Sequence, residues 1–148
     1  MAWRRIKSSV LVPVENESGA ALSLEVARSF VEHPAEIHML TVVVPPSSVS
    51  PGVIWGTVDV NTVLSATEAF LREIACTHGF SEANIHVRLG TAGPEIARFA
   101  AEEAIELIVL PSRGRRGFDR FVLGSTAEQV VRRAKCEVFV IHPEHGPD

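Results

Sequence analysis

Short apolar runs alternate along the chain with segments whose apolar residues recur at helical spacing. The runs are rich in β-branched residues, as expected for strands covered on both faces, and cover Ser9–Val14, Glu36–Val44, Ile85–Leu89, Leu107–Leu110 and Val138–His142. The helical segments lie between them, at Ala20–Glu32, Asp59–His78, from Pro94 onward, and Thr126–Lys135. This alternation predicts βαβ units and a mainly parallel sheet with helices on both faces, an α/β fold.

Glycine and proline mark several of the predicted boundaries. Gly79 is placed to end the long helix as its C′ residue, and Pro94 is placed at the first position of the next helix. Pro111 is expected to end the fourth strand. The segment 45–56, PPSSVSPGVIWG, is the one long irregular stretch, and Trp55 within it is interpreted as an anchor to the core or as a lid over a ligand.

Length and composition fit one soluble domain spanning residues 1–148. The hydrophobic content is 46%, and the longest apolar run is far shorter than the roughly 18 residues of a membrane span. The formal net charge of −4 argues against general nucleic-acid binding, which usually shows a basic surface. Cys76 and Cys136 form no C-x-x-C motif and are interpreted as buried, reduced thiols of a cytoplasmic protein.

The loop before the last helix has the residues of an anion site. Glycines allow backbone N–H groups to approach a ligand closely, and a helix start offers unpaired donors and a positive dipole end. The loop contains the glycines Gly114, Gly117 and Gly124, the arginines Arg113, Arg115, Arg116 and Arg120, and a helix start at Ser125. A phosphate is the ligand that this combination favours.

A purely structural interpretation of the same loop stands beside this one. Ser125 and Glu128 have the spacing of a capping box, so Ser125 could serve only its own helix. The loop is neither a Walker A loop nor a dinucleotide-binding fingerprint, because it lacks both the Gly-Lys-Ser/Thr end and the G-x-G-x-x-G spacing.

The sequence gives weak support to enzymatic chemistry. No serine hydrolase pattern is present, and the six histidines are scattered, with only His142 and His145 at a metal-like spacing. Asp119 and Glu128 are carboxylates that could hold Mg²⁺ beside a triphosphate. We therefore assign no catalytic residue and no protein-bound metal, and expect at most slow ATP hydrolysis.

Several motifs of the chain resemble those of the universal stress protein family, whose fold is of the adenine nucleotide alpha-hydrolase type. The resemblance runs from the opening VLVPV through TVVVPP and ELIVL, and it is most specific in GRRGFDRFVLGSTAEQVVRRAKCEVFVI. It implies a three-layer sandwich around a five-stranded parallel sheet of order 3-2-1-4-5. It also implies a stress-response role, an adenine nucleotide (ATP or AMP), Mg²⁺ with ATP, and a homodimer formed through Val138–His142.

The resemblance also implies the residues of the nucleotide site. Pro13 and Val14 at the end of the first strand would wall the pocket, and Glu15 would stand where family members often have an aspartate near the adenosine. Backbone groups of Val42 or Val43 would contact the base. The phosphates would lie against the glycine loop and the helix that follows it, at Pro111, Arg113, Gly114, Arg115, Gly124, Ser125 and Thr126.

Two departures from the family pattern keep a second hypothesis open. Pro111 stands where the family motif begins with glycine, and Glu15-Asn16-Glu17 replaces a turn that often carries aspartate. The first hypothesis is a dimeric nucleotide sensor that signals to an unidentified protein partner. The alternative is a dimeric interaction module of the same family that binds no nucleotide.

Overall fold

The computed structural model describes residues 6–45, 59–112 and 123–142. Five strands form one parallel sheet, β1 (Val10–Pro13), β2 (Ile37–Val43), β3 (Asn84–Leu89), β4 (Leu107–Pro111) and β5 (Glu137–Ile141). Their order across the sheet is β3-β2-β1-β4-β5, and every neighbouring pair is parallel. The predicted fold class and strand order are therefore confirmed.

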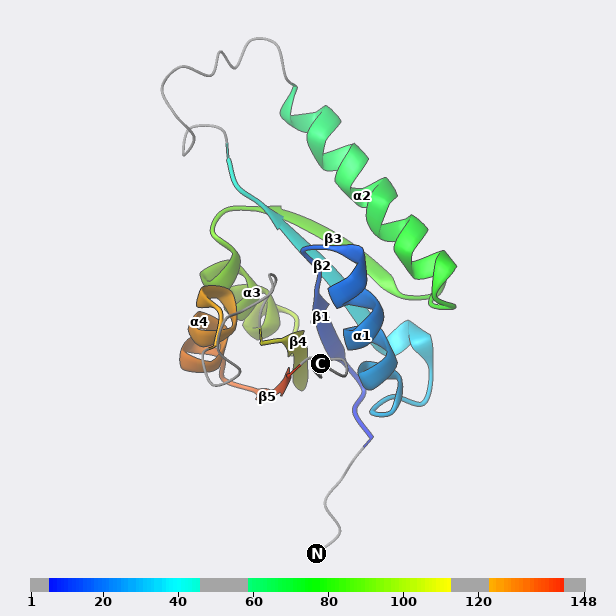
Figure 1. Ribbon diagram of the computed structural model, residues 1–148, viewed down its shortest axis with the longest axis vertical. Helices are drawn as coiled ribbons and strands as arrows, with labels where there is room; N and C mark the ends of the chain where they lie inside the picture. The colour runs from blue at the N-terminus through cyan, green and yellow to red at the C-terminus, as the bar shows by residue number, and fades with distance from the viewer. Residues whose placement is uncertain (1–5, 46–58, 113–122, 143–148) are drawn as a thin grey trace, which may run out of the picture.

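Helices cover both faces of the sheet (Figure 1). The four helices are α1 (Glu17–Arg28), α2 (Val60–Thr77), α3 (Ala92–Glu102) and α4 (Ser125–Arg133), and the 3-10 helix η1 (Pro34–Glu36) precedes β2. α1 and α2 lie on one face, and α3 and α4 lie on the other. This is the three-layer arrangement that the alternating pattern predicts.

Alternation along the central strand divides the core into two halves. Val10 and Val12 of β1 point into the cluster beneath α1 and α2, whereas Leu11 points into the cluster beneath α3 and α4. All three side chains are fully buried. The continuous apolar strands thus supply residues to both faces, as expected for a parallel sheet covered by helices.

Helix α1 begins and ends earlier than the predicted Ala20–Glu32. Asn16 is its N-cap, and the Asn16 side chain accepts a hydrogen bond from the N–H of Gly19. This cap lets the polar residues after Asn16 form the first turn, where the sequence predicts a loop. At the other end the helix closes at Ser29, whose N–H donates to the carbonyl of Val26.

Helix α2 is only partly packed on the sheet, in contrast to the uniform inward stripe predicted for it. Leu71, Ile74 and Ala75 are buried near its C-terminal end, whereas Val60 and Val63 are not. A helix of 18 residues is about 27 Å long, and a seven-residue strand spans only about 23 Å. This difference of about 4 Å is less than one helical turn, and the first half of α2 extends beyond the sheet mainly because of where the helix is placed (Figure 1).

Of the two prolines predicted at element boundaries, Pro94 lies two residues further into its helix than predicted, and Pro111 lies at the end of β4. Helix α3 begins at Ala92, so Pro94 occupies its third position instead of its first. A proline is accepted there because the first N–H groups of a helix have no intrahelical partner. Pro111 ends β4 as predicted, but as its last residue and not as the residue after it, in register with Ile141 of β5.

Candidate functional site

The candidate site lies at the carboxyl ends of β1 and β4, which are neighbours in the sheet. The helix that follows β1 covers one face of the sheet, and the helix that follows β4 covers the other. The order of strands therefore reverses between β1 and β4. Such a switch point is the usual place for a ligand in an open parallel sheet.

Backbone hydrogen bonds tie the end of β4 to the start of α4. The N–H of Gly124 donates to the carbonyl of Ser112 at 2.7 Å, and the N–H of Ser112 donates to the carbonyl of Ile141 at 2.8 Å. Ser112 is 3% exposed. These bonds hold the two ends of the glycine loop close together. The loop residues Arg113, Gly114 and Arg115 lie outside the described residues, as do Gly117, Asp119 and Trp55.

The start of α4 differs from the predicted capping box. Gly124 is the N-cap residue, so no side chain caps the helix, and Ser125 is an exposed residue of the first turn. The helix begins one residue earlier than predicted because the carbonyl of Gly124 already accepts the N–H of Glu128. The Glu128 carboxylate pairs with Arg132 at 2.7 Å. The first turn of α4 thus presents backbone donors that no serine side chain occupies.

The end of β1 is fixed by buried contacts. Pro13 is the last strand residue, and the side chain of Val14 is 3% exposed within the core beneath α1 and α2. The N–H of Val14 donates to the carbonyl of Leu40, and the carbonyl of Val14 accepts from the hydroxyl of Thr41. The Val14 side chain is therefore part of the core, and only the backbone of this segment faces the carboxyl edge of the sheet.

Glu15 is the first exposed residue after β1, and its side chain reaches α4. The hydroxyl Oγ1 of Thr126 donates to Oε1 of Glu15 at 3.3 Å. Glu15 and Thr126 are 111 positions apart in the sequence, and the hydrogen bond joins the two sides of the switch point. The two predicted site residues are thus brought into direct contact.

The proline that departs from the family pattern packs against α1. A Cβ atom placed on Gly19 would lie 3.6 Å from Cγ of Pro111, which is ordinary van der Waals contact. The proline ring thus lies in contact distance of the first turn of α1, and even a Cβ atom at Gly19 would fit beside it. Pro111 is accommodated by its neighbours and does not distort β4.

The two valines predicted to contact a base lie at the end of β2. The side chain of Val42 packs against the core beneath α3 and α4, and the carbonyl of Val43 accepts the N–H of Gly90 at 2.9 Å. Val42 and Val43 are in register with Arg88 and Leu89 of β3. They share the carboxyl edge of the sheet with β1, as the sequence predicts.

Sequence reasoning missed a pair of histidines between β2 and β3. His38 and His86 have ring nitrogens 3.0 Å apart and nearly parallel rings. Burial lowers the pKa of both side chains, and the charge of Glu103 opposes this shift. The ring of Phe99 lies 4.6 Å from the ring of His86. No motif places these histidines together, because only the register of the two strands does so.

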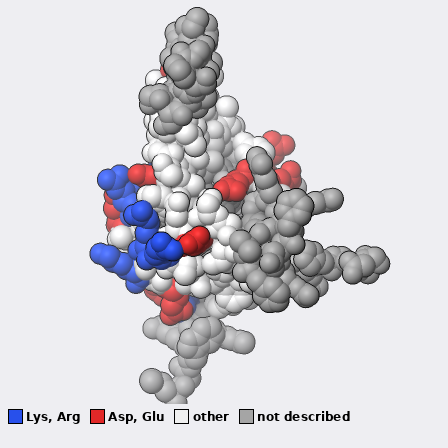
Figure 2. All heavy atoms as spheres, turned by 60° about the vertical axis from the view of Figure 1, so that its left-hand side comes forward, with Lys and Arg blue, Asp and Glu red and all other residues white. Residues whose placement is uncertain are grey.

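Ion pairs lie along α3 and α4, and one joins α3 to β3. In Figure 2 the lysine and arginine side chains gather on one side of the molecule with carboxylates beside them. Arg88 pairs with Glu102 at 2.7 Å, and Arg98 pairs with Glu95 at 3.1 Å. Arg88 and Glu95 are only 29% and 18% exposed, but their partners Glu102 and Arg98 are 48% and 65% exposed. Each pair therefore keeps one solvated member and contributes about 0–1 kcal/mol.

Neither cysteine forms a disulfide, but the prediction that both are buried is wrong for Cys76. Cys76 is exposed on α2, and Cys136 is half-buried before β5. Burial raises the pKa of the Cys136 thiol. Within residues 6–45, 59–112 and 123–142, no three histidine, cysteine or acidic side chains are grouped so as to hold a metal. None of the described helices has the length and apolar character to cross a membrane.

A shallow hollow of about 350 Å³ lies away from the candidate site. It is lined by the end of α3 and by the residues that precede β5, namely Ala100, Ala101, Ala104, Ile105, Lys135 and Cys136. These residues lie at the amino ends of β4 and β5, whereas the candidate site lies at the carboxyl ends.

Two curated universal stress proteins are similar in sequence to parts of this chain. The universal stress protein MJ0531 of Methanocaldococcus jannaschii is 39% identical over 59 residues, which are 38% of this chain and 35% of that protein. The universal stress protein E homolog of Haemophilus influenzae is 36% identical over 70 residues, which are 47% of this chain and 23% of that protein. The chain thus spans only about a quarter to a third of the length of these curated relatives.

Solved structures share the fold over nearly the whole chain. Hypothetical protein MJ0577 superposes with a TM-score of 0.71 at 17% identity, covering 94% of this chain and 99% of the other. A universal stress protein in complex with cAMP gives 0.58 at 16% identity, with 91% and 96% covered. The universal stress protein of Archaeoglobus fulgidus in complex with dAMP gives 0.54 at 20% identity, with 91% and 98% covered.

The family model of universal stress proteins matches residues 8–142. This range includes the five strands and the four α-helices of the described residues. The chain belongs to the universal stress protein family.

Proposed function

We propose that this protein binds an adenine nucleotide, ATP or AMP, at the carboxyl ends of β1 and β4 and acts as a dimeric regulator of a stress response. The observation that carries the proposal is the start of α4, which no side chain caps and which the bond between Gly124 and Ser112 holds at the switch point. Two proteins of the same fold are bound to cAMP and dAMP. Those complexes support an adenine nucleotide here.

The proposed site combines groups from three strand ends and one helix start. The ribose and base side would be formed by Pro13, Val14 and Glu15 after β1 and by backbone groups of Val42 and Val43 at the end of β2. The phosphate side would be formed by Pro111, Arg113, Gly114, Arg115, Gly124, Ser125 and Thr126. Backbone N–H groups and the positive end of the α4 dipole would stabilise the phosphate there. Mg²⁺ would accompany ATP.

We propose that the dimer forms through β5, the last strand on one side of the sheet. The observed strand is Glu137–Ile141, one residue earlier than the predicted Val138–His142. An unpaired apolar edge strand favours pairing with a second copy, and a two-fold partner would cover it. An unidentified protein partner would then respond to the nucleotide state of the dimer. We place this regulator in the cytoplasm.

A dimeric interaction module without nucleotide is the alternative function. The observation that favours it is the contact between Glu15 and Thr126, which places a carboxylate at the helix start where a phosphate would bind. The two functions predict different titrations. Isothermal titration of the protein with ATP, ADP and AMP, with and without Mg²⁺, gives saturable micromolar binding for the first function. The second gives no heat and no thermal shift at millimolar nucleotide.

The variant Gly124→Val tests the location of the site. Gly124 has φ −63° and ψ 159°, angles that valine adopts without strain. The added side chain would occupy the phosphate position, so we expect at least a tenfold loss of nucleotide affinity. Ala134→Val is a matched control, because Ala134 caps the other end of α4 at φ −65° and ψ 141°. Unchanged affinity in Gly124→Val would place the ligand elsewhere.

A further inference from the structure

The Glu15 carboxylate occupies a defined position across the proposed site. Its hydrogen bond to the Thr126 hydroxyl, at 3.3 Å, links the end of β1 to the first turn of α4. Thr126 is the second residue of this nine-residue helix. A carboxylate at this point is stabilised by the positive end of the helix dipole. The protein thus carries a carboxylate within hydrogen-bonding distance of Thr126, a residue of the proposed phosphate side.

The backbone on both sides of Glu15 is fixed. Val14 before it is 3% exposed and hydrogen-bonded through both its N–H and its carbonyl. Asn16 after it caps α1 through the N–H of Gly19 at 2.8 Å. The anchored residues on both sides keep the backbone of Glu15 at the carboxyl edge of the sheet, beside the start of α4. The charge of Glu15 therefore acts on any ligand at the switch point.

None of the ion pairs among the described residues involves Glu15. A like charge several ångströms from a phosphate disfavours binding, and the cost grows with each phosphate that a ligand carries. The cost is small for a neutral nucleoside and largest for a triphosphate. The charge series from adenosine to ATP therefore reports how strongly Glu15 acts on the site.

We propose that Glu15 is a specificity-determining residue that makes the site favour adenine ligands of low negative charge, a nucleoside or a monophosphate, over ATP. This proposal rests on the proposed function and narrows its ligand class. It also accounts for the coexistence of a family-like helix start with an altered turn after β1. The carboxylate competes with additional phosphates for the Thr126 hydroxyl and repels them by its charge.

The test is a titration series of adenosine, AMP, ADP and ATP with the wild type, Glu15→Gln and Glu17→Gln. Glutamine at position 15 keeps the size of the side chain and an oxygen that can accept from Thr126, so only the charge changes. Glu17→Gln removes a charge two residues away, but Glu17 lies 3.6 Å from His78 on the side of α2. It is therefore the matched control for overall charge.

We expect Glu15→Gln to tighten ATP binding by about three- to tenfold and adenosine binding by less than about twofold. Effects of this size are typical of unit charges several ångströms apart near a protein surface. Glu17→Gln should leave the ratio of the two affinities within about twofold of the wild type. An unchanged ratio in Glu15→Gln, or an equal change in both variants, would overturn this proposal alone. Absence of binding of all four ligands to every protein would overturn the proposed function as well.

Discussion

The Nδ1 atom of His38 lies 3.0 Å from the Nε2 atom of His86, and the two rings are inclined by only 17°. One ring nitrogen must donate and the other must accept, so at least one imidazole has to be neutral. The pair lies between adjacent strands β2 and β3, against the ring of Phe99. Protonation of both rings would replace a hydrogen bond with repulsion.

This pair makes the stability of the protein depend on pH. Burial lowers the pKa of both histidines below 6.5 in the folded state, with Glu103 opposing the shift and Arg88 adding to it at His86. The unfolded chain therefore binds more protons as the pH falls through about 6.5, and the free energy of unfolding decreases. Above that pH the contribution of the pair is fully present. We expect the free energy of unfolding to fall between about pH 7.5 and about pH 5, because histidine titrates in roughly this window.

Urea unfolding at a series of pH values checks this expectation. His86→Gln should reduce the slope of unfolding free energy against pH, because one of the two half-buried imidazoles is gone. His33→Gln is the control, since His33 is exposed and lies at the start of η1, away from the pair. A wild-type slope that His86→Gln leaves unchanged would contradict the assignment to this pair.

The contact between α3 and α4 depends on a glycine. A Cβ atom on Gly93 would lie only 2.5 Å from Cβ of Gln129, so the two helices could not keep their present separation. We expect Gly93→Ala to destabilise the fold by about 1–3 kcal/mol through overpacking. Thermal unfolding should show a decrease of several degrees, since 1 kcal/mol corresponds to roughly 2–4 °C in a domain of this size.

A double-mutant cycle isolates the steric origin of this effect. Gln129→Gly removes the atoms that a new methyl group at Gly93 would meet. In that background Gly93→Ala should lower the free energy of unfolding much less, because only the higher helix propensity of alanine remains and it favours the helix. An equal cost in both backgrounds would show that packing against Gln129 is not the cause.

The hydrophobic pattern predicts the layers and the strand positions well, because strands covered by helices on both faces need continuous apolar runs. Gly79 was predicted as a helix C′ residue, and it adopts a φ of +82°, where glycine carries no Cβ penalty. The starts of helices are less well predicted. Asn16 and Gly124 act as caps where the polar pattern alone suggests a loop and a serine cap.

Contacts between strands and between distant loops could not be predicted. His38 meets His86 only because Leu40 of β2 is in register with His86 of β3. Glu15 meets Thr126 only because β1 and β4 are neighbours while their helices lie on opposite faces. Pro111 packs beside Gly19, a contact between residues 92 positions apart that no local pattern contains.

The N-cap of α1 anchors the backbone beside Glu15. Asn16 accepts the N–H of Gly19 at 2.8 Å through its side chain. We expect Asn16→Ala to lower the free energy of unfolding by about 1 kcal/mol, and Asn16→Asp to retain most of it, because aspartate caps about as well as asparagine. Chemical denaturation of the three proteins measures both changes. Equal losses in the two variants would mean that the cap is not what Asn16 contributes.

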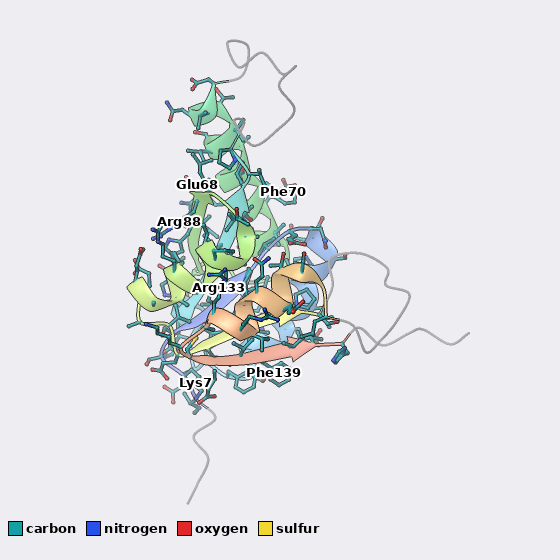
Figure 3. All side chains as sticks on the ribbon, turned by 90° about the vertical axis from the view of Figure 1, so that its left-hand side faces the viewer. Lys7, Glu68, Phe70, Arg88, Arg133 and Phe139 are labelled. Carbon is teal, nitrogen blue, oxygen red and sulfur yellow. The ribbon has the colours of Figure 1, made fainter. Side chains whose placement is uncertain are left out.

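The proposed dimer gives the last prediction, and it depends on one face of β5. Phe139 is 42% exposed and lies on the opposite side of the strand from α4 (Figure 3), where its ring is 5.6 Å from that of Phe30. A second copy paired along β5 would bury much of this ring. A lysine there would have to be desolvated in the interface, and charged residues are a natural means of blocking edge pairing.

We therefore expect Phe139→Lys to weaken the dimer by about 30-fold or more, the effect of losing an interface hot spot. Val131→Lys is the control, because Val131 is similarly exposed, at 47%, but lies on α4 instead of β5. Sedimentation equilibrium over a concentration series measures both association constants. A dimer that survives Phe139→Lys with its affinity intact must use another surface, whereas a wild type that is monomeric at all concentrations has no β5 interface. Selective loss in Phe139→Lys would assign the interface to this edge of the sheet, because the two variants add the same charge and differ only in the element that carries it.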